Sequence, residues 1–224
     1  MKFEDMINKV IEGNCLEVMR NIPDNSIDCI VTDPPYGMDY QSSWRIDKFD
    51  KIIQDNDISW FYPFINEAHR VLKENTHIYV FCNDYAISEF RNGMKEAGFN
   101  IKRTLIWVKN NHTSGDLEGD YGNKTEFILY AQKGRKNLNG KRDTNVLYYD
   151  RVNSLRHPTE KPLSLFNYLI QKSTSEGDIV LDPFLGSGTT SESARNLGRN
   201  YIGIELNPQY VKVANDRLAQ DILI

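Results

Sequence analysis

The sequence predicts an α/β fold in which helices cover both faces of a mostly parallel sheet. Short runs of β-branched and aromatic residues, typical of buried strands, alternate along the chain with stretches of helical periodicity. Strands that alternate with helices form parallel sheets whose faces the helices cover. The 224 residues are 40% hydrophobic and 26% charged, which fits one folded domain and excludes a chain that is disordered throughout.

Seven segments are expected to form strands. The first is short and lies at Val10 and Ile11. The other six are apolar runs separated by turn-forming residues, at residues 28–32, 78–82, 105–108, 127–130, 179–181 and 201–204. Their continuous apolar character indicates strands that are buried on both sides.

Five stretches are expected to form helices. In residues 60–72 the apolar side chains recur three and four positions apart, which gives one apolar face. The other candidates are residues 86–97, 163–172, a stretch from 189, and 208–218. Asn207 before Pro208 is typical of a helix start, and Gly98 is typical of the position after a helix end.

The charge is unevenly distributed. The chain carries a net charge of −4, but residues 131–157 carry +5. A basic segment on an acidic body is compatible with contact to a polyanion, and equally with a solvated loop that happens to be rich in Lys and Arg. Residues 110–156 are polar apart from the strand near Phe127, so we expect an insertion or a set of long loops there.

Cellular location is indicated by what the sequence lacks. Cys15, Cys29 and Cys82 are odd in number and lack metal-ligand spacing, so we expect reduced thiols, no disulfide and no metal site. No apolar run is long enough for a membrane span, and the acidic N-terminus does not resemble a secretory signal. We therefore expect a cytoplasmic protein with no membrane partner.

The first motif, Asp33-Pro34-Pro35-Tyr36, directly follows the strand at 28–32. Ligands of open parallel sheets bind beyond the carboxyl ends of the strands. A carboxylate, a rigid carbonyl at Pro34 and an aromatic face at Tyr36 suit a flat ring that bears an amine. The carboxylate and the carbonyl can each accept one N–H, which localises the nitrogen lone pair. The alternative is a strand that ends in a proline-rich turn.

The second motif, residues 182–190, follows the strand at 179–181 and leads into a helix. Gly186 and Gly188 allow a tight turn and a close approach to a ligand. The motif lacks the features of a P-loop and of the dinucleotide pattern. Glu205, at the tip of the next strand, is placed to hold ribose hydroxyls, or else it is a solvated strand end.

Together these residues resemble the beta class of amino-group DNA methyltransferases, over nearly the whole chain. Residues 157–162 look like the segment that precedes the cofactor helix of that family. The catalytic motif precedes the cofactor loop, and this order distinguishes the class from related RNA and protein methyltransferases. The resemblance implies a Rossmann-like fold that uses S-adenosylmethionine. It also implies one domain over residues 1–224, with a short target-recognition insertion at about 110–156.

The resemblance also implies roles for individual residues. The catalytic residues would be Asp33, Pro34, Pro35 and Tyr36. The residues near the cofactor would be Asn14, Asp33, His157, Lys161, Asp182, Phe184, Gly186, Ser187, Gly188, Thr189 and Glu205. The family often has Asp where this chain has Asn14, whose amide oxygen can still accept a hydrogen bond. His157 and Lys161 could also be ordinary surface residues.

The implied reaction is methyl transfer to the exocyclic amine of a base that is flipped out of double-stranded DNA. In the family, Asp at the position of Asp33 goes mostly with adenine N6. The alternatives are cytosine N4, an RNA amine, and a catalytically silent DNA-binding subunit. A homodimer and a separate restriction endonuclease of a restriction-modification pair are further possible partners.

Two segments are candidates for contact with DNA. The loop after the catalytic motif contributes Tyr40, Trp44 and Arg45. The basic segment contributes Lys133, Arg135, Lys136, Lys141 and Arg142. The alternative for the loop is a mobile surface segment without a ligand.

Overall fold

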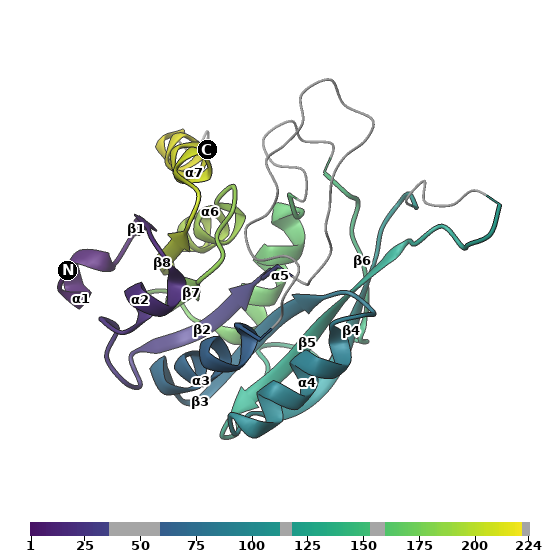
Figure 1. Cartoon of the computed structure of the whole chain (residues 1–224), viewed down its shortest axis with the longest axis horizontal. Coiled ribbons are helices and arrows are strands. Elements are labelled where there is room, and N and C mark those ends of the chain that lie inside the picture. The colour runs from purple at the N-terminus through teal and green to yellow at the C-terminus, as the bar shows by residue number, and fades with distance from the viewer. Residues whose placement is uncertain (36–58, 113–117, 153–159, 221–224) are drawn as a thin grey trace.

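A computed structural model describes residues 1–35, 59–112, 118–152 and 160–220. These residues form an eight-stranded sheet with the order β1-β8-β7-β2-β3-β5-β4-β6 (Figure 1). The strands are β1 (Lys9–Glu12), β2 (Ile27–Thr32), β3 (Leu72–Cys82), β4 (Asn100–Val108), β5 (Thr125–Lys133), β6 (Val146–Tyr148), β7 (Ile179–Asp182) and β8 (Asn200–Glu205). Neighbouring strands are parallel except where β5 pairs with β3 and β4.

Helices cover both faces of this sheet (Figure 1). They are α1 (Phe3–Met6), α2 (Cys15–Met19), α3 (Phe61–Val71), α4 (Ile87–Glu96), α5 (Leu163–Ser173), α6 (Thr189–Asn196) and α7 (Pro208–Ala219). One apolar cluster joins α1–α4 to the sheet, and a second joins α5 and α6 to its other face. Adjacent residues of β2 show the division, because Ile30 belongs to the first cluster and Val31 to the second.

The elements confirm the predicted α/β fold. The side chain of Asn207 caps α7 by accepting a hydrogen bond from the backbone N–H of Gln209 at 2.9 Å. The structure also contains α1, α2 and β6, which the sequence analysis missed because they are too short to show a clear period.

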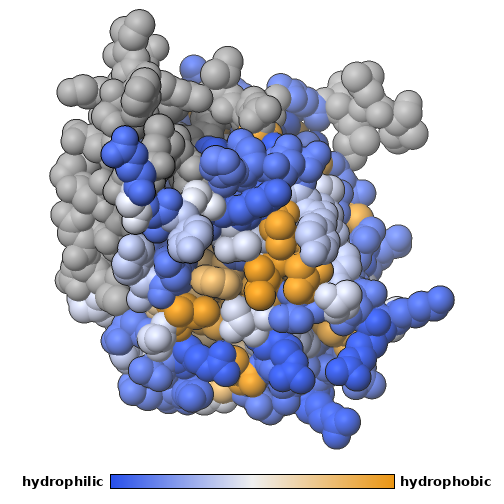
Figure 2. Space-filling model, turned by 90° about the vertical axis from the view of Figure 1, so that its right-hand side faces the viewer, coloured by the Kyte–Doolittle hydropathy of each residue, from blue (hydrophilic) through white to orange (hydrophobic). Residues whose placement is uncertain are grey.

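The stretch at 110–156 contributes two strands to the sheet, the predicted one near Phe127 and a short one that was not predicted. Its strand β5 lies between β3 and β4, and its strand β6 forms one edge of the sheet. Figure 2 shows the side of the molecule that carries this edge, where hydrophilic side chains surround a small hydrophobic cluster. A short edge strand in a mainly polar surface offers little template for pairing with another chain.

Two further features bear on the sequence predictions. Cys15, Cys29 and Cys82 are free thiols, and burial raises the pKa of each to about 12. Within the described ranges, no helix combines the length and the apolar character needed to span a bilayer.

Candidate active site

The two sequence motifs meet at the carboxyl edge of the sheet, where the parallel strands end; the opposite side, where they begin, is the amino edge. Asp33 directly follows β2, Asp182 ends β7, and Glu205 ends β8. β7 pairs with both β2 and β8 in parallel register, so the carboxyl ends of the three strands lie next to one another. This is the edge at which open parallel sheets bind their ligands.

Asp182 connects the two motifs. Its Oδ1 accepts hydrogen bonds from Thr32 Oγ1 at 2.7 Å and from the backbone N–H of Phe184 at 3.1 Å, and its Oδ2 accepts from Thr190 Oγ1. Burial raises the pKa of Asp182 to about 7, although these hydrogen bonds oppose the shift. Three elements, β2, β7 and α6, are therefore fastened by one carboxyl group, and this gives Asp182 an anchoring role in the predicted cofactor site.

Glu205 fastens the glycine loop to β8. Its Oε2 accepts a hydrogen bond from the backbone N–H of Gly186, and its Oε1 accepts one from that of Asn207, both at 2.8 Å. Burial raises the pKa of Glu205, and these donors oppose that shift. An ionised carboxylate has about four acceptor positions, so Glu205 can accept further bonds from ribose hydroxyls.

Two glycines give the loop its shape. Gly188 has φ +90° and directly precedes α6, so a side chain there would be strained. Gly203 lies beneath the loop, where an added Cβ would lie 2.4 Å from Leu185 Cδ2. The loop therefore packs directly on the β8 backbone. It places a carboxylate beside the first backbone N–H groups of a helix, and this combination fits a nucleoside cofactor.

Asp33 is part of a cluster of alternating charges. Lys161, which is 6% exposed, donates a hydrogen bond to Asp33 Oδ2, and its Nζ lies 3.3 Å from Glu126 Oε2. Glu126 Oε1 in turn lies 2.8 Å from Lys109 Nζ. Burial would raise the pKa of Glu126, but the ammonium groups of Lys161 and Lys109 outweigh it and lower that pKa. The structure thus places the predicted residue Lys161 against the predicted catalytic carboxylate.

Comparison with known proteins identifies the family. Residues 27–216 match the family model described as DNA methylase. The chain belongs to this family. The DNA adenine methyltransferase YhdJ of Escherichia coli (strain K12) is 31% identical over 259 residues, which cover 97% of this chain and 84% of YhdJ. The expectation of an amino-group DNA methyltransferase is confirmed.

Solved structures of related methylases have the same fold. The M1.HpyAVI-SAM complex is 29% identical, with a TM-score of 0.74 over 95% of this chain and 99% of that one. The cytosine-N4-specific PvuII DNA methyltransferase has a TM-score of 0.79 over 96% of this chain and 87% of its own. Its identity of 20% limits that likeness to the fold.

Arg217 of the methylase was not predicted, yet it supports the loop that is predicted to bind the cofactor. Its buried guanidinium donates to Thr189 Oγ1 at 3.1 Å and pairs with Glu160 at 2.9 Å and with Glu192. It also lies 3.4–3.5 Å from the oxygens of Ser187. The signal in the sequence was its position three residues after the buried Ala214, on the inner face of α7.

Two other predicted cofactor residues hold neighbouring elements. The side chain of Asn14 accepts a hydrogen bond from the backbone N–H of Leu16 at 2.9 Å and so caps α2. Gly13 donates to the backbone carbonyl of Glu205 at 3.0 Å, which keeps Asn14 beside the end of β8. The ring of Phe184 packs against Trp60 and Phe64 with centroids 5.1 Å apart, and so joins the loop to α3.

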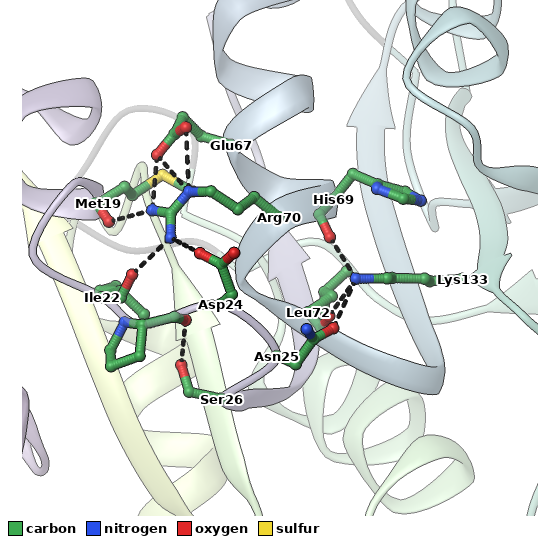
Figure 3. A network of polar contacts seen from close by, with 11 residues as sticks. Met19, Ile22, Asp24, Asn25, Ser26, Glu67, His69, Arg70, Leu72 and Lys133 are labelled. Atoms are coloured by element: carbon green, nitrogen blue, oxygen red, sulfur yellow. Dashed lines mark hydrogen bonds and ion pairs between the residues drawn. The ribbon is translucent and has the colours of Figure 1, made fainter.

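The predicted DNA contact of Lys133 is not supported. Its ammonium is buried and donates hydrogen bonds to Asn25 Oδ1 and to the backbone carbonyls of His69 and Leu72, at 2.8–2.9 Å (Figure 3). β5 is antiparallel to β3, so Lys133 lies opposite Thr76 at the amino end of β3, while Asp33 is at the other edge. The prediction failed because counting Lys and Arg along the sequence does not reveal in which direction a strand runs through the sheet.

The other predicted DNA contacts of the basic segment, Arg135, Lys136, Lys141 and Arg142, also lie at that far edge. Lys136 Nζ donates to the backbone carbonyl of Ser173 at the end of α5, and Lys172 of α5 donates to the carbonyl of Lys141. Arg135, Lys141 and Arg142 are exposed there, away from Asp33. The predicted residues Tyr36, Tyr40, Trp44, Arg45 and His157 lie outside the described residues.

Proposed function

We propose that this methylase transfers the methyl group of S-adenosylmethionine to the N6 amine of an adenine in double-stranded DNA. The observation that carries the proposal is the position of Asp33, at the end of the strand that pairs with β7, which leads into the glycine loop. An acceptor for the amine and a site for the methyl donor would then share one edge of the sheet. The family match supports the same reaction class.

The residues of the chain would prepare the amine for attack. The carboxylate of Asp33 and the carbonyl of Pro34 each accept one N–H of the exocyclic amine, so the nitrogen lone pair is withdrawn from the ring. Pro35 lacks a backbone N–H that could compete for these acceptors. Tyr36 would stack on the base. Positioning and fixed charges supply the rate enhancement, without a covalent enzyme intermediate.

The cofactor would lie along the ends of β7 and β8. When bound, S-adenosylmethionine supplies a methyl group on a positively charged sulfur, which an amine can attack. Glu205 would accept the ribose hydroxyls, while Gly186 and Gly188 let the backbone approach the bound molecule. Asp182 and Arg217 would hold this loop in place from behind.

Adenine is preferred to cytosine on two grounds. In the resembling family, Asp at the position of Asp33 goes mostly with adenine, and YhdJ, at 31% identity, is named a DNA adenine methyltransferase.

We also propose that DNA approaches the carboxyl edge of the sheet, which carries Asp33. The connection between β4 and β5 extends from that edge (Figure 1) and carries the exposed Tyr121 and Lys124.

Nucleoside mass spectrometry tests the proposal directly. Unmethylated duplex DNA is incubated with the protein and S-adenosylmethionine, digested and analysed, with Asp33→Asn as the matched control. N6-methyladenine from the wild type, absent with Asp33→Asn, is the expected result. N4-methylcytosine would overturn the choice of base. No methylated nucleoside from DNA, with cofactor binding demonstrated, would contradict the proposal and direct the next assay to structured RNA.

A further inference from the structure

Lys161 lies between two carboxylates that belong to different strands. Asp33 follows β2 and Glu126 is the second residue of β5, and the ammonium of Lys161 contacts both. The ammonium also lies 5.5 Å from the centre of the Phe81 ring, over an apolar surface. Burial would lower the pKa of Lys161, but Asp33 and Glu126 outweigh it and raise that pKa. Lys161 therefore stays protonated beside Asp33, the carboxylate that must accept the target amine.

This arrangement poses an electrostatic problem for methyl transfer. As the amine nitrogen bonds to the methyl carbon, the carbon–sulfur bond breaks and its electron pair stays on sulfur. The nitrogen becomes positive until it releases a proton, which leaves through the Asp33 carboxylate to solvent. A carboxylate beside that nitrogen stabilises the developing charge, whereas an ammonium paired with the same carboxylate opposes it. Moving a buried ammonium away from its partner is costly unless a second partner is near.

Glu126 is that second partner. Its Oε2 is 3.3 Å from Lys161 Nζ, close enough for the ammonium to be shared between Glu126 and Asp33 without crossing open space. Lys109, at 2.8 Å from Oε1, balances the remaining charge and lies over the Trp107 ring. Among the described residues of this cluster, two carboxylates and two ammonium groups alternate, so their charges sum to zero.

We propose that Glu126 is a positioning residue for methyl transfer, which draws Lys161 away from Asp33 when the target amine enters. The proposal deepens the proposed function and holds for an adenine or a cytosine amine. Glu126 touches neither the base nor the methyl group in this scheme. It acts through Lys161, by setting how much of that positive charge remains on Asp33.

Glu126→Gln tests this role because it removes the second partner with little change in shape. We expect kcat to fall about 30-fold, because Lys161 then loses the carboxylate that draws it from Asp33 and opposes the developing charge. Glu126→Asp keeps the charge and should restore part of kcat. The matched control is Glu67→Gln, which loses the carboxylate that binds Arg70 of α3 at the amino edge (Figure 3) and should keep wild-type kcat.

A binding measurement separates this role from a merely structural one. S-adenosylmethionine carries a positive sulfur and S-adenosylhomocysteine does not, so calorimetry with both reports the charge of the cluster. Glu126→Gln should weaken binding of S-adenosylmethionine relative to binding of S-adenosylhomocysteine by about fivefold. Lys109→Gln removes a positive charge instead and should shift that ratio in the opposite direction.

Wild-type kcat in Glu126→Gln, or equal losses for both ligands together with a lower Tm, would overturn the role of Glu126. If Glu126→Gln does not fold, an unchanged ratio in Lys109→Gln overturns it. Full turnover in Asp33→Asn would instead overturn the role proposed for Asp33, so failure of the underlying mechanism is seen separately.

Discussion

Replacing Asp182 with asparagine should remove a pH dependence from the stability of the fold. The carboxyl group is 3% exposed, and burial raises its pKa to about 7 from an ordinary value of 3.8. The folded state therefore holds a proton that the unfolded chain releases at lower pH. Stability from this group is present below the unfolded pKa and is lost as the pH rises towards the folded pKa.

The magnitude follows from the size of the shift. Each pH unit in which the folded state binds one more proton than the unfolded chain costs about 1.4 kcal/mol. Between pH 5 and the folded pKa of about 7 this amounts to about 3 kcal/mol. Asparagine has nearly the same shape and does not titrate, so the variant should lack this loss.

Urea unfolding at pH 5, 6, 7 and 8 measures the effect. The free energy of unfolding of the wild type, minus that of Asp182→Asn, should decrease by about 3 kcal/mol across the series. Asp143→Asn is the control, because hydrogen bonds from Lys172 and Tyr168 lower the pKa of Asp143, so its titration falls below this range. A difference that stays constant with pH would refute the buried, protonated carboxyl group.

Four further predictions concern the predicted cofactor loop, the far edge of the sheet (two of them) and the assembly. Arg217→Lys keeps the charge, but the lysine cannot reach Glu160, Glu192 and Thr189 together, so calorimetry should show about fivefold weaker binding of S-adenosylmethionine. Unchanged affinity would show that the loop keeps its conformation without the Arg217 contacts. Lys133→Met leaves three oxygens without their donor and should lower the free energy of unfolding by about 3 kcal/mol. Triple replacement of Arg135, Lys141 and Arg142 by alanine should leave DNA affinity at a fixed salt concentration unchanged, whereas a large loss would place DNA at the amino edge. Light scattering of the complex with DNA should give the mass of two chains plus that of the DNA, and the mass of one chain plus the DNA would exclude the homodimer that the sequence suggests.

The sequence predicted where each long strand lies because each contains a continuous apolar run, but β3, β4 and β5 extend beyond that run into polar residues. The strand at 127–130 illustrates both the success and its limit. Its apolar residues revealed a strand, but its antiparallel direction depends on pairing with β3 and β4, which local residues do not encode. Because β5 is antiparallel to its neighbours, Glu126 at its start lies at the carboxyl edge and Lys133 at its end lies at the amino edge.

The site residues were predictable where a motif lies at the end of a strand. Asp33, Asp182 and Glu205 each follow or end an apolar run, so their meeting at one edge follows from a parallel sheet. Glu126 and Arg217 belong to no motif. Glu126 contacts Lys161, which is 35 residues away in the chain, and Arg217 pairs with Glu160, which is 57 residues away. Charges that matter through tertiary pairing leave only a weak local signal, such as an acid inside an apolar strand.

Residues 160 and 161 show how the two halves of the site are joined. Glu160 pairs with Arg217, which holds the cofactor loop through Thr189. The next residue, Lys161, binds Asp33 on the catalytic side. One short segment in front of α5 therefore contacts the first motif directly, through Lys161, and the second motif indirectly, through Glu160 and Arg217. Because the side chains of Glu160 and Lys161 are almost fully buried, neither can shift without affecting the other, so the position of Asp33 depends on the same segment that supports the cofactor loop.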